Sequence, residues 1–255
     1  MSNHKIMEMP LDIVVSVRNV SKNYGDIKAV NSISFSIEKS HTLGLLGSNG
    51  AGKTTIIMML MGILKPSSGK INILNKNIYK HRNQISKEIN FASPFVELPH
   101  KLTVLQNLTV FGHIYGVKNL SYKIEKLAQD LDIKDLLKRR VGRLSAGQKT
   151  RVSIAKSLIN NPKILFLDEP TASLDPDHAD WIRTYLEEYK NNSGATFILA
   201  SHNMPEVERM CNNVIMMGRG KVIDQGAPAN LIRRYKRNNL EQVFLQLARN
   251  DRYSN

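Results

Sequence analysis

The stretch of sequence that decides the fold is Gly47-Ser48-Asn49-Gly50-Ala51-Gly52-Lys53-Thr54-Thr55. It matches the pattern G-x-x-x-x-G-K-[ST] in full. In this pattern the glycines let consecutive backbone N–H groups curve around phosphate oxygens, and the N-terminus of the following helix attracts the same negative charge. Lys53 would neutralise the β- and γ-phosphates of a nucleotide, and the Thr54 hydroxyl would hold Mg²⁺. We therefore predict that residues 47–55 bind a nucleotide.

The residues on either side of this loop support the interpretation. Residues 42–46 are apolar and predict a short buried strand. Residues 54–64 are apolar enough for a buried helix, and Lys65, Pro66 and Gly69 close it. A strand that leads into the glycine-rich loop and a helix that follows it form the context in which this pattern is informative. Without that context, the loop would be an ordinary glycine-rich turn.

A second chemical signal lies at Asp168 and Glu169, directly after the apolar run 164–167. Two adjacent carboxylates at the end of a buried strand are costly unless a cation or a proton compensates them. The alternative is a helix cap at the end of the strand. Beside a phosphate-binding loop, we predict that Asp168 belongs to the metal site, just outside the direct ligands of Mg²⁺. Glu169 would activate the attacking water.

The rest of the chain alternates in character. Residues 13–17 and 33–37 predict strands, with a turn at 22–25 between them. From about 100 to 158 the pattern becomes helical, and Thr103 and Gln106 form a capping box at its start. Strands and helices then alternate again, with strands at 164–167 and 196–200, a helix at 179–190, and a hairpin at 214–217 and 221–223. The tail carries Leu240, Val243, Phe244 and Leu247 on one helical face, a pattern more typical of ordinary packing than of a partner-binding helix.

Composition limits the possible classes of protein. The chain has 255 residues, of which 42% are hydrophobic and 23% charged, so it is long and apolar enough to build a core. A single cysteine, Cys211, excludes an intramolecular disulfide framework. The longest apolar run, 56–64, is too short for a bilayer, and we expect neither a secretory signal nor a membrane span. The net charge of +14 is compatible with nucleic acid, anionic lipid or an acidic protein as partner.

Residues 144–148, Leu144-Ser145-Ala146-Gly147-Gln148, resemble the signature sequence of the ABC (ATP-binding cassette) ATPase family. The same residues also read as a capping box, from Ser145 to Gln148, that opens a helix through Leu158. The two interpretations are compatible. The resemblance implies an α/β fold, with a P-loop NTPase (RecA-like) core, an antiparallel β subdomain and a helical insertion subdomain. It also implies that Ser145, Gly147 and Gln148 face the γ-phosphate held by the other subunit of a dimer. Ala146 departs from the more usual glycine.

Further positions match the same family. Tyr24 stands where the family places an aromatic residue that stacks on adenine, and the alternative is a tyrosine that only forms part of a turn. Asp175, in Ser173-Leu174-Asp175, resembles the loop that contacts the partner's nucleotide site. His202 matches the histidine that senses the γ-phosphate, and the other six histidines are assigned no role. One departure is Pro94, which stands where the family has a glutamine, and Ser93 is a weak substitute for it.

The resemblance predicts three parts: a core with its β subdomain at 1–99 and 159–230, a helical signature subdomain at 100–158, and a helical tail at 231–255. It implies ATP and Mg²⁺ as cofactors, with Glu169, His202 and Lys53 as catalytic residues. We predict an ATPase that powers a separate transmembrane permease from the cytoplasmic face of the cell membrane. We expect it to pair with itself or with a related ATPase, without nucleic acid as partner.

The stretch 200–208 and the residues after it resemble ATPases of exporters for drugs, lipids or polysaccharides. Two alternatives stay open at this point. One is a soluble ABC ATPase that acts on the ribosome or on DNA, which the positive charge would suit. The other is a weakly hydrolysing regulatory module, which Pro94 would suit.

Overall fold

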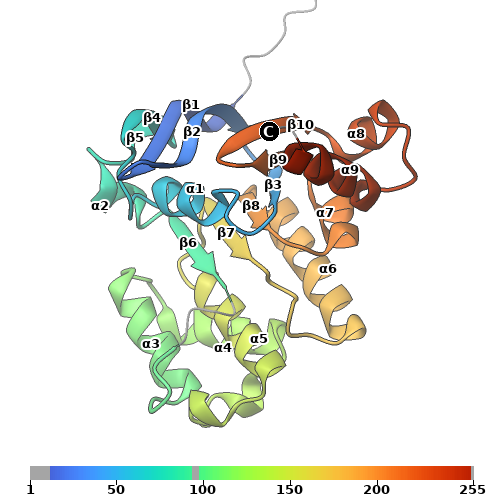
Figure 1. Cartoon of the computed structure of the whole chain (residues 1–255). Helices are drawn as coiled ribbons and strands as arrows, with labels where there is room; N and C mark the ends of the chain where they lie inside the picture. Colours follow the sequence, from blue (N-terminus) through green and yellow to red (C-terminus); the bar gives the residue numbers. More distant parts are fainter. Residues whose placement is uncertain (1–11, 94–97, 254–255) are drawn as a thin grey trace, which may run out of the picture.

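A six-stranded sheet forms the centre of the molecule in the computed structural model, which describes residues 12–93 and 98–253 (Figure 1). Its strand order is β10-β9-β3-β8-β7-β6. The strands are β3 (Thr42–Gly47), β6 (Ile89–Ala92), β7 (Ile164–Asp168), β8 (Thr196–Ala200), β9 (Asn213–Gly218) and β10 (Lys221–Gly226). Neighbouring strands from β9 to β6 run parallel, and β10 pairs antiparallel with β9. The carboxyl ends of the parallel strands therefore meet at one edge, where ligands bind in open α/β sheets.

The parallel strands are buried on both faces, as their continuous apolar runs predict. Ile164 and Phe166 of β7 face one core, whereas Leu165 and Leu167 face the other. All four side chains are fully buried. This burial fixes the register of β7, because a shift by one residue would exchange its two faces and carry Asp168 out of place.

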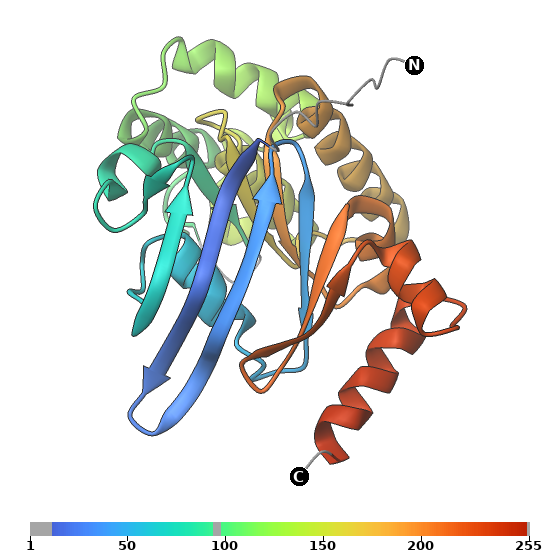
Figure 2. The same ribbon diagram turned by 90° about the horizontal axis from the view of Figure 1, so that it is seen from above.

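A smaller antiparallel sheet packs over one side of the larger sheet (Figure 2). Its strand order is β2-β1-β4-β5, with β1 (Ile13–Tyr24), β2 (Ile27–Glu38), β4 (Ser68–Ile73) and β5 (Lys76–Asn77). The helix α1 (Lys53–Leu60) lies between the two sheets and buries Ile56, Ile57, Met59 and Leu60. Because α1 is apolar along this length, the core holds it directly behind the glycine-rich loop.

Two local predictions differ from the structure, and glycine explains both. The turn expected at 22–25 lies instead at Gly25 and Asp26, and Lys22 to Tyr24 still belong to β1. Gly25 has φ +57, a conformation that glycine adopts at little cost. The helix expected over 54–64 ends earlier, at Leu60, and Gly62 follows with φ +68.

Three helices form the half of the molecule that lies farthest from the smaller sheet (Figure 1). They are α3 (Val104–Ile114), α4 (Leu120–Asp130) and α5 (Ala146–Ser157), joined by the 3₁₀ turns η1 (Lys134–Leu136) and η2 (Val141–Arg143). Both predicted capping boxes are present, at Thr103 for α3 and at Ser145 for α5. These helices lie within the range 100–158 that was expected to be helical. The division of the chain into domains stays a prediction.

The remaining helices are α2 (Arg82–Ile85), α6 (Pro176–Ser193), α7 (Met204–Met210), α8 (Pro228–Arg234) and α9 (Leu240–Tyr253). Side chains from α6, α7, α8 and α9 join the core on the face of the large sheet opposite α1. In α9, Leu240, Val243 and Leu247 are buried and Phe244 packs beside them, so the predicted stripe serves packing. Within the described residues, no helix combines the length and the apolar character that crossing a membrane requires.

Candidate nucleotide-binding and catalytic site

The glycine-rich loop leaves the carboxyl end of β3 and is pressed against its neighbours. A Cβ added at Gly47 would lie 2.7 Å from the carbonyl oxygen of Met217, which no side chain tolerates. Gly52 has φ +101, and a Cβ there would lie 2.6 Å from the carbonyl oxygen of Ala29. Between them, Ser48, Asn49 and Gly50 are exposed. The two glycines therefore let the backbone approach β9 and β2 while the loop stays open to solvent.

Lys53 lies over this loop at the start of α1. Its Nζ donates to the carbonyl oxygens of Gly47, at 2.6 Å, and Ser48, at 3.2 Å. Burial lowers the pKa of Lys53, and the negative charges of Glu169 and Asp168 oppose that shift. Thr54 is exposed beside it and Thr55 is half-buried. The loop thus presents an ammonium group, a helix N-terminus and an exposed hydroxyl to one region of solvent, which suits a phosphate group.

Asp168 is the last residue of β7 and is half-buried. Its Oδ2 accepts a hydrogen bond from Ser93 Oγ at 3.3 Å. Burial raises the pKa of Asp168, against the opposing effects of Ser93, Lys53 and His202. Ser93, the weak substitute for the glutamine that the family has at position 94, thus contacts Asp168, the carboxylate predicted at the metal site. Pro94 lies outside the described residues.

These residues fit Mg²⁺ chemically. The ion prefers oxygen ligands and is usually bound through one or two protein groups together with substrate phosphates. The Thr54 hydroxyl and the Asp168 carboxylate supply oxygens of this kind, and burial makes the carboxylate gain from a nearby cation. Among the residues that the structure describes, no three His, Cys, Asp or Glu side chains cluster as a metal site of their own.

Glu169 follows Asp168. Its backbone has φ +50, a conformation that is unusual for a residue other than glycine. Its backbone N–H donates to Ala200 O at 2.8 Å, and its Oε1 accepts from the backbone N–H of His202, also at 2.8 Å. His202 Nε2 lies 3.9 Å from the same oxygen. Burial raises the pKa of Glu169, while the nearby His202 opposes that shift. The carboxylate is therefore fixed in direction and is more basic than an ordinary glutamate.

Tyr24 ends β1 with about half of its surface exposed, 49%, and Lys22 Nζ lies 5.3 Å from the centre of its ring. The β1–β2 hairpin reaches the glycine-rich loop through Ala29, whose carbonyl oxygen faces Gly52. An open aromatic ring at the tip of this hairpin suits stacking against a flat base.

The chain as a whole resembles known proteins over most of its length. The family model described as ABC transporter matches residues 30–172. The chain belongs to the ABC transporter family. Nod factor export ATP-binding protein I of Rhizobium sp. (strain N33) is 36% identical over 224 residues, which cover 86% of this chain and 73% of that protein. The ABC transporter ATP-binding protein NatA of Bacillus subtilis (strain 168) is 33% identical, over 91% of this chain and 97% of that protein.

A solved structure agrees with these relatives. It is cbiO1 from Clostridium perfringens, described as part of the ABC transporter complex cbiONQ, with a TM-score of 0.78 and 33% identity. The match covers 94% of this chain and 98% of that structure. The chain is therefore an ATP-binding subunit of the ABC transporter kind with the P-loop NTPase fold. The predictions of family and fold class are confirmed.

The predicted signature residues, 145–148, stand at the start of α5, apart from the glycine-rich loop of this ABC subunit (Figure 1). Ser145 is the N-cap of α5, and its Oγ accepts from Gln148 N at 3.3 Å while Gln148 Oε1 accepts from Ser145 N at 3.1 Å. A Cβ added at Gly147 would lie 3.3 Å from Leu174 Cδ2 and 3.6 Å from the carbonyl oxygen of Ser173. Figure 1 shows α5 and α1 in different halves of the molecule. A single chain thus does not bring residues 145–148 to Lys53.

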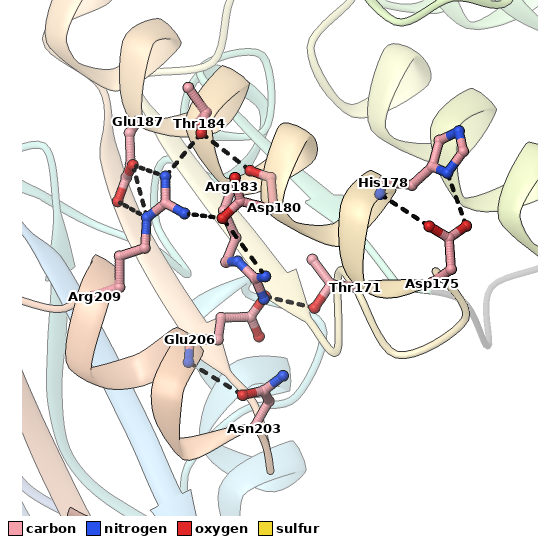
Figure 3. A network of polar contacts seen from close by, with 10 residues as sticks. All are labelled: Thr171, Asp175, His178, Asp180, Arg183, Thr184, Glu187, Asn203, Glu206 and Arg209. Atoms are coloured by element: carbon pink, nitrogen blue, oxygen red, sulfur yellow. Dashed lines mark hydrogen bonds and ion pairs between the residues drawn. The ribbon is translucent and has the colours of Figure 1, made fainter.

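Asp175 lies in the loop that Gly147 approaches. It caps α6, because its Oδ1 accepts from His178 N at 3.1 Å, and its Oδ2 lies 2.7 Å from His178 Nδ1 (Figure 3). The hydrogen bond from His178 N–H holds the pKa of Asp175 below its ordinary value. Asp175 directly follows the two residues, Ser173 and Leu174, that lie beside Gly147.

Sequence reasoning missed a group of buried polar residues behind Glu169 and His202. They are Thr171, Ser201 and Glu206, each at most 5% exposed. The missed signal was the helical spacing of Met204, Val207 and Met210, which marks an apolar face of α7 beside Glu206. A carboxylate on the edge of such a face needs polar partners in the core.

Proposed function

We propose that this ABC subunit hydrolyses ATP to ADP and phosphate and thereby powers transport through a separate membrane permease. The observation that carries the proposal is the position of Glu169. The backbone N–H of His202 fixes its carboxylate at the edge of the sheet from which the loop leading to Lys53 also leaves. A relative named for Nod factor export supports an exporter. Its cargo would be of drug, lipid or polysaccharide type, and its place would be the cytoplasmic face of the membrane.

In the proposed reaction, Tyr24 stacks on adenine while residues 47–52 and Lys53 bind the phosphates. The Glu169 carboxylate accepts a proton from a water molecule, whose oxygen attacks the γ-phosphorus as the bond to the β-phosphate oxygen breaks. Burial favours this role because a raised pKa makes the carboxylate a better proton acceptor. Lys53 and His202 would stabilise negative charge on the transferred phosphoryl group.

Thr54 would bind Mg²⁺ directly, and Asp168 would help to hold it from just outside the direct ligands. When bound, the ion supplies positive charge to the phosphate oxygens. The contact between Ser93 and Asp168 orients that carboxylate. Because Asp168 gains from a nearby cation, binding of the ion and ionisation of Asp168 would favour each other.

A dimer would complete the site. The helix α5, which begins at the predicted signature residues Ser145, Gly147 and Gln148, lies in the other half of the molecule from α1 (Figure 1), and the residues before Asp175 lie beside Gly147. A second copy, or a related ATPase, turned to face this one would bring them to the γ-phosphate. The exposed N-terminus of α5 then provides N–H groups toward that phosphate. The separation of these residues from Lys53 within one chain supports this arrangement.

The permease would contact a cavity of about 1020 Å³ between the sheet half and the helical half. Lys163 and Glu88 line it from just before β7 and β6, and Ile114 and Tyr115 from the end of α3. Ile114 is 68% exposed there. A partner segment that binds in this cavity would contact both the sheet half and the helical half. Any rotation of one half against the other would therefore move that segment.

The substitution Glu169→Gln tests hydrolysis. It keeps the shape of the side chain and removes the proton acceptor, so we expect turnover to fall by about 100-fold or more. ATP-dependent dimers should accumulate, as size-exclusion chromatography with ATP can measure. The matched control is Glu188→Gln, which removes the negative charge of an exposed residue on α6 and should leave turnover unchanged. Turnover of Glu169→Gln at the wild-type rate would contradict the assignment of the base.

Affinity purification of the tagged chain from detergent-solubilised membranes tests the transport role. We expect a protein with several membrane spans to co-purify. Recovery of ribosomes or DNA-repair proteins without a membrane protein would support the soluble alternative instead. ATP binding without turnover, even with the membrane partner present, would support the regulatory one.

A further inference from the structure

Glu206, in the first turn of α7, is a buried carboxylate with two hydroxyl partners. It is 1% exposed, and its Oε1 accepts from Thr171 Oγ1 at 2.7 Å while its Oε2 accepts from Ser201 Oγ at 2.6 Å. For packing alone, an apolar side chain of similar length would be less costly, because a buried carboxylate loses its hydration. The two short hydrogen bonds are what compensates that loss.

The two hydroxyl groups belong to different loops. Thr171 lies two residues after Glu169, in the loop that follows β7, and Ser201 directly precedes His202, in the loop that follows β8. The strands β7 and β8 are parallel neighbours, so both loops leave the same edge of the sheet. Glu206 therefore bridges the loop of the proposed base and the loop of the proposed γ-phosphate contact.

Further contacts lock Glu206 to the second loop (Figure 3). Asn203 Oδ1 accepts from Glu206 N at 3.2 Å. Asn203 N also donates to Ser201 Oγ, at 3.1 Å. On the first loop, Thr171 O accepts from Leu174 N at 3.1 Å, which begins the turn that leads to Asp175. A displacement of Glu206 would thus be transmitted to both loops through hydrogen bonds.

We propose that Glu206 is a positioning residue, which sets the separation and orientation of Glu169 and His202 by holding Thr171 and Ser201 together. This inference rests on the proposed roles of Glu169 and His202 in ATP hydrolysis. Glu206 itself does not touch the nucleotide. Its effect therefore belongs to the chemical step, and the affinity for ATP should not depend on it.

Thr171→Val and Ser201→Ala test the bridge from its two ends with small changes. Each removes one hydroxyl and keeps most of the side-chain volume. We expect each to lower kcat by about tenfold, since small misplacements of catalytic groups are costly, while the KM for ATP stays within about twofold. Ser157→Ala is the matched control, because Ser157 Oγ is equally buried and bonds to Ile154 O, within its own helix. It should lower the melting temperature and leave kcat unchanged.

Glu206 variants then show whether the two hydroxyls act through the carboxylate. We expect Glu206→Ala to lower kcat at least as much as either hydroxyl variant, and Thr171→Val to add no further loss in that background. Glu206→Gln keeps one acceptor and gains one donor toward the second hydroxyl, so it should recover most of the kcat that Glu206→Ala loses.

The proposal is overturned if Thr171→Val and Ser201→Ala melt earlier but keep the wild-type kcat per folded molecule. It is equally overturned if their losses add in full in the Glu206→Ala background. Glu169→Gln in the same assay separates these outcomes from a failure of the proposed function. If wild-type chain turns over ATP and Glu169→Gln does not, a null effect of the bridge variants counts against Glu206 alone.

Discussion

Glu169 shows how a strained backbone can serve a reactive side chain. Its φ of +50 is costly for a residue with a Cβ, and such strain persists only where neighbours enforce it. Here the enforcing bonds are those to Ala200 O and from His202 N. The sequence identifies the carboxylate from its place after an apolar strand. It cannot give the conformation, because the atoms that impose it come from β8, about 30 residues further along the chain.

The raised pKa of Glu169 predicts the acid limb of the pH–rate profile. Below its pKa the carboxyl is neutral and cannot accept a proton, so turnover is lost as pH falls through that value. Because burial raises the pKa above its ordinary 4.5, the loss should begin at a higher pH than for an exposed glutamate. Measuring kcat for ATP from pH 8 downward tests this prediction.

The variant His202→Gln tests the assignment of this limb to Glu169. In that variant the limb should persist and move to higher pH, because His202 favours the ionised form of Glu169. Disappearance of the limb in His202→Gln, or its movement to lower pH, would contradict the assignment to Glu169.

Tyr24 carries a prediction about affinity. Stacking of a base on an aromatic ring contributes about 1–3 kcal/mol, so Tyr24→Ala should raise the KM for ATP by roughly tenfold with little change in kcat. Tyr24→Trp keeps a stacking surface and is the matched control, which should stay near wild type. Equal KM values for all three proteins, measured by steady-state kinetics, would mean that Tyr24 only shapes the hairpin.

At the scale of elements, α3 and α5 both begin with a capping box. Each has a hydroxyl N-cap and a glutamine at the third helical position, with both capping hydrogen bonds present. Such a box depends on two residues that are three positions apart, which is why the sequence alone predicted both helix starts. The two caps differ in the capping residue, threonine for α3 and serine for α5, and in their surroundings, since Ser145 lies in the predicted signature stretch.

This pair of caps permits a matched comparison. Ser145→Ala and Thr103→Ala should each lower the free energy of unfolding by about 1 kcal/mol, as measured by urea denaturation. Only Ser145→Ala should also reduce ATP turnover, because the α5 cap is expected to face the γ-phosphate in the dimer. An equal fall of turnover in both variants would indicate that stability alone limits the activity.

Where the bounds or contacts of an element depend on residues far along the chain, the sequence alone could not predict them. Residues 54–64 have the composition of one helix, yet α1 ends at Leu60. Beyond it, Gly62 has φ +68, and a Cβ there would lie 2.8 Å from Ile78, a residue of the smaller sheet region. Glu206 was missed for the same reason, since its partners Thr171 and Ser201 lie in two loops that only the sheet brings together.

For the whole molecule, the apolar runs predicted buried parallel strands, and the family resemblance supplied the division into halves. Neither could predict the cavity between the halves, because its lining comes from segments about 90 residues apart, from Leu74 to Lys163. Among the described residues, Lys76, Lys87 and Lys163 line it against one acid, Glu88, which Lys163 contacts at 3.1 Å. In a chain of net charge +14, this surface favours a partner segment that is acidic as well as apolar.

Ile114→Glu tests whether this cavity receives the permease. The side chain is exposed, so the change should alter the free energy of unfolding by less than about 0.5 kcal/mol and leave the ATP turnover of the isolated subunit intact. A buried negative charge at the interface should reduce co-purification of the membrane partner by about tenfold or more. Leu245→Glu, at an exposed position on α9, is the matched control and should retain the partner. If Ile114→Glu retains the partner and Leu245→Glu loses it, the docking surface lies on the tail and the cavity has another occupant.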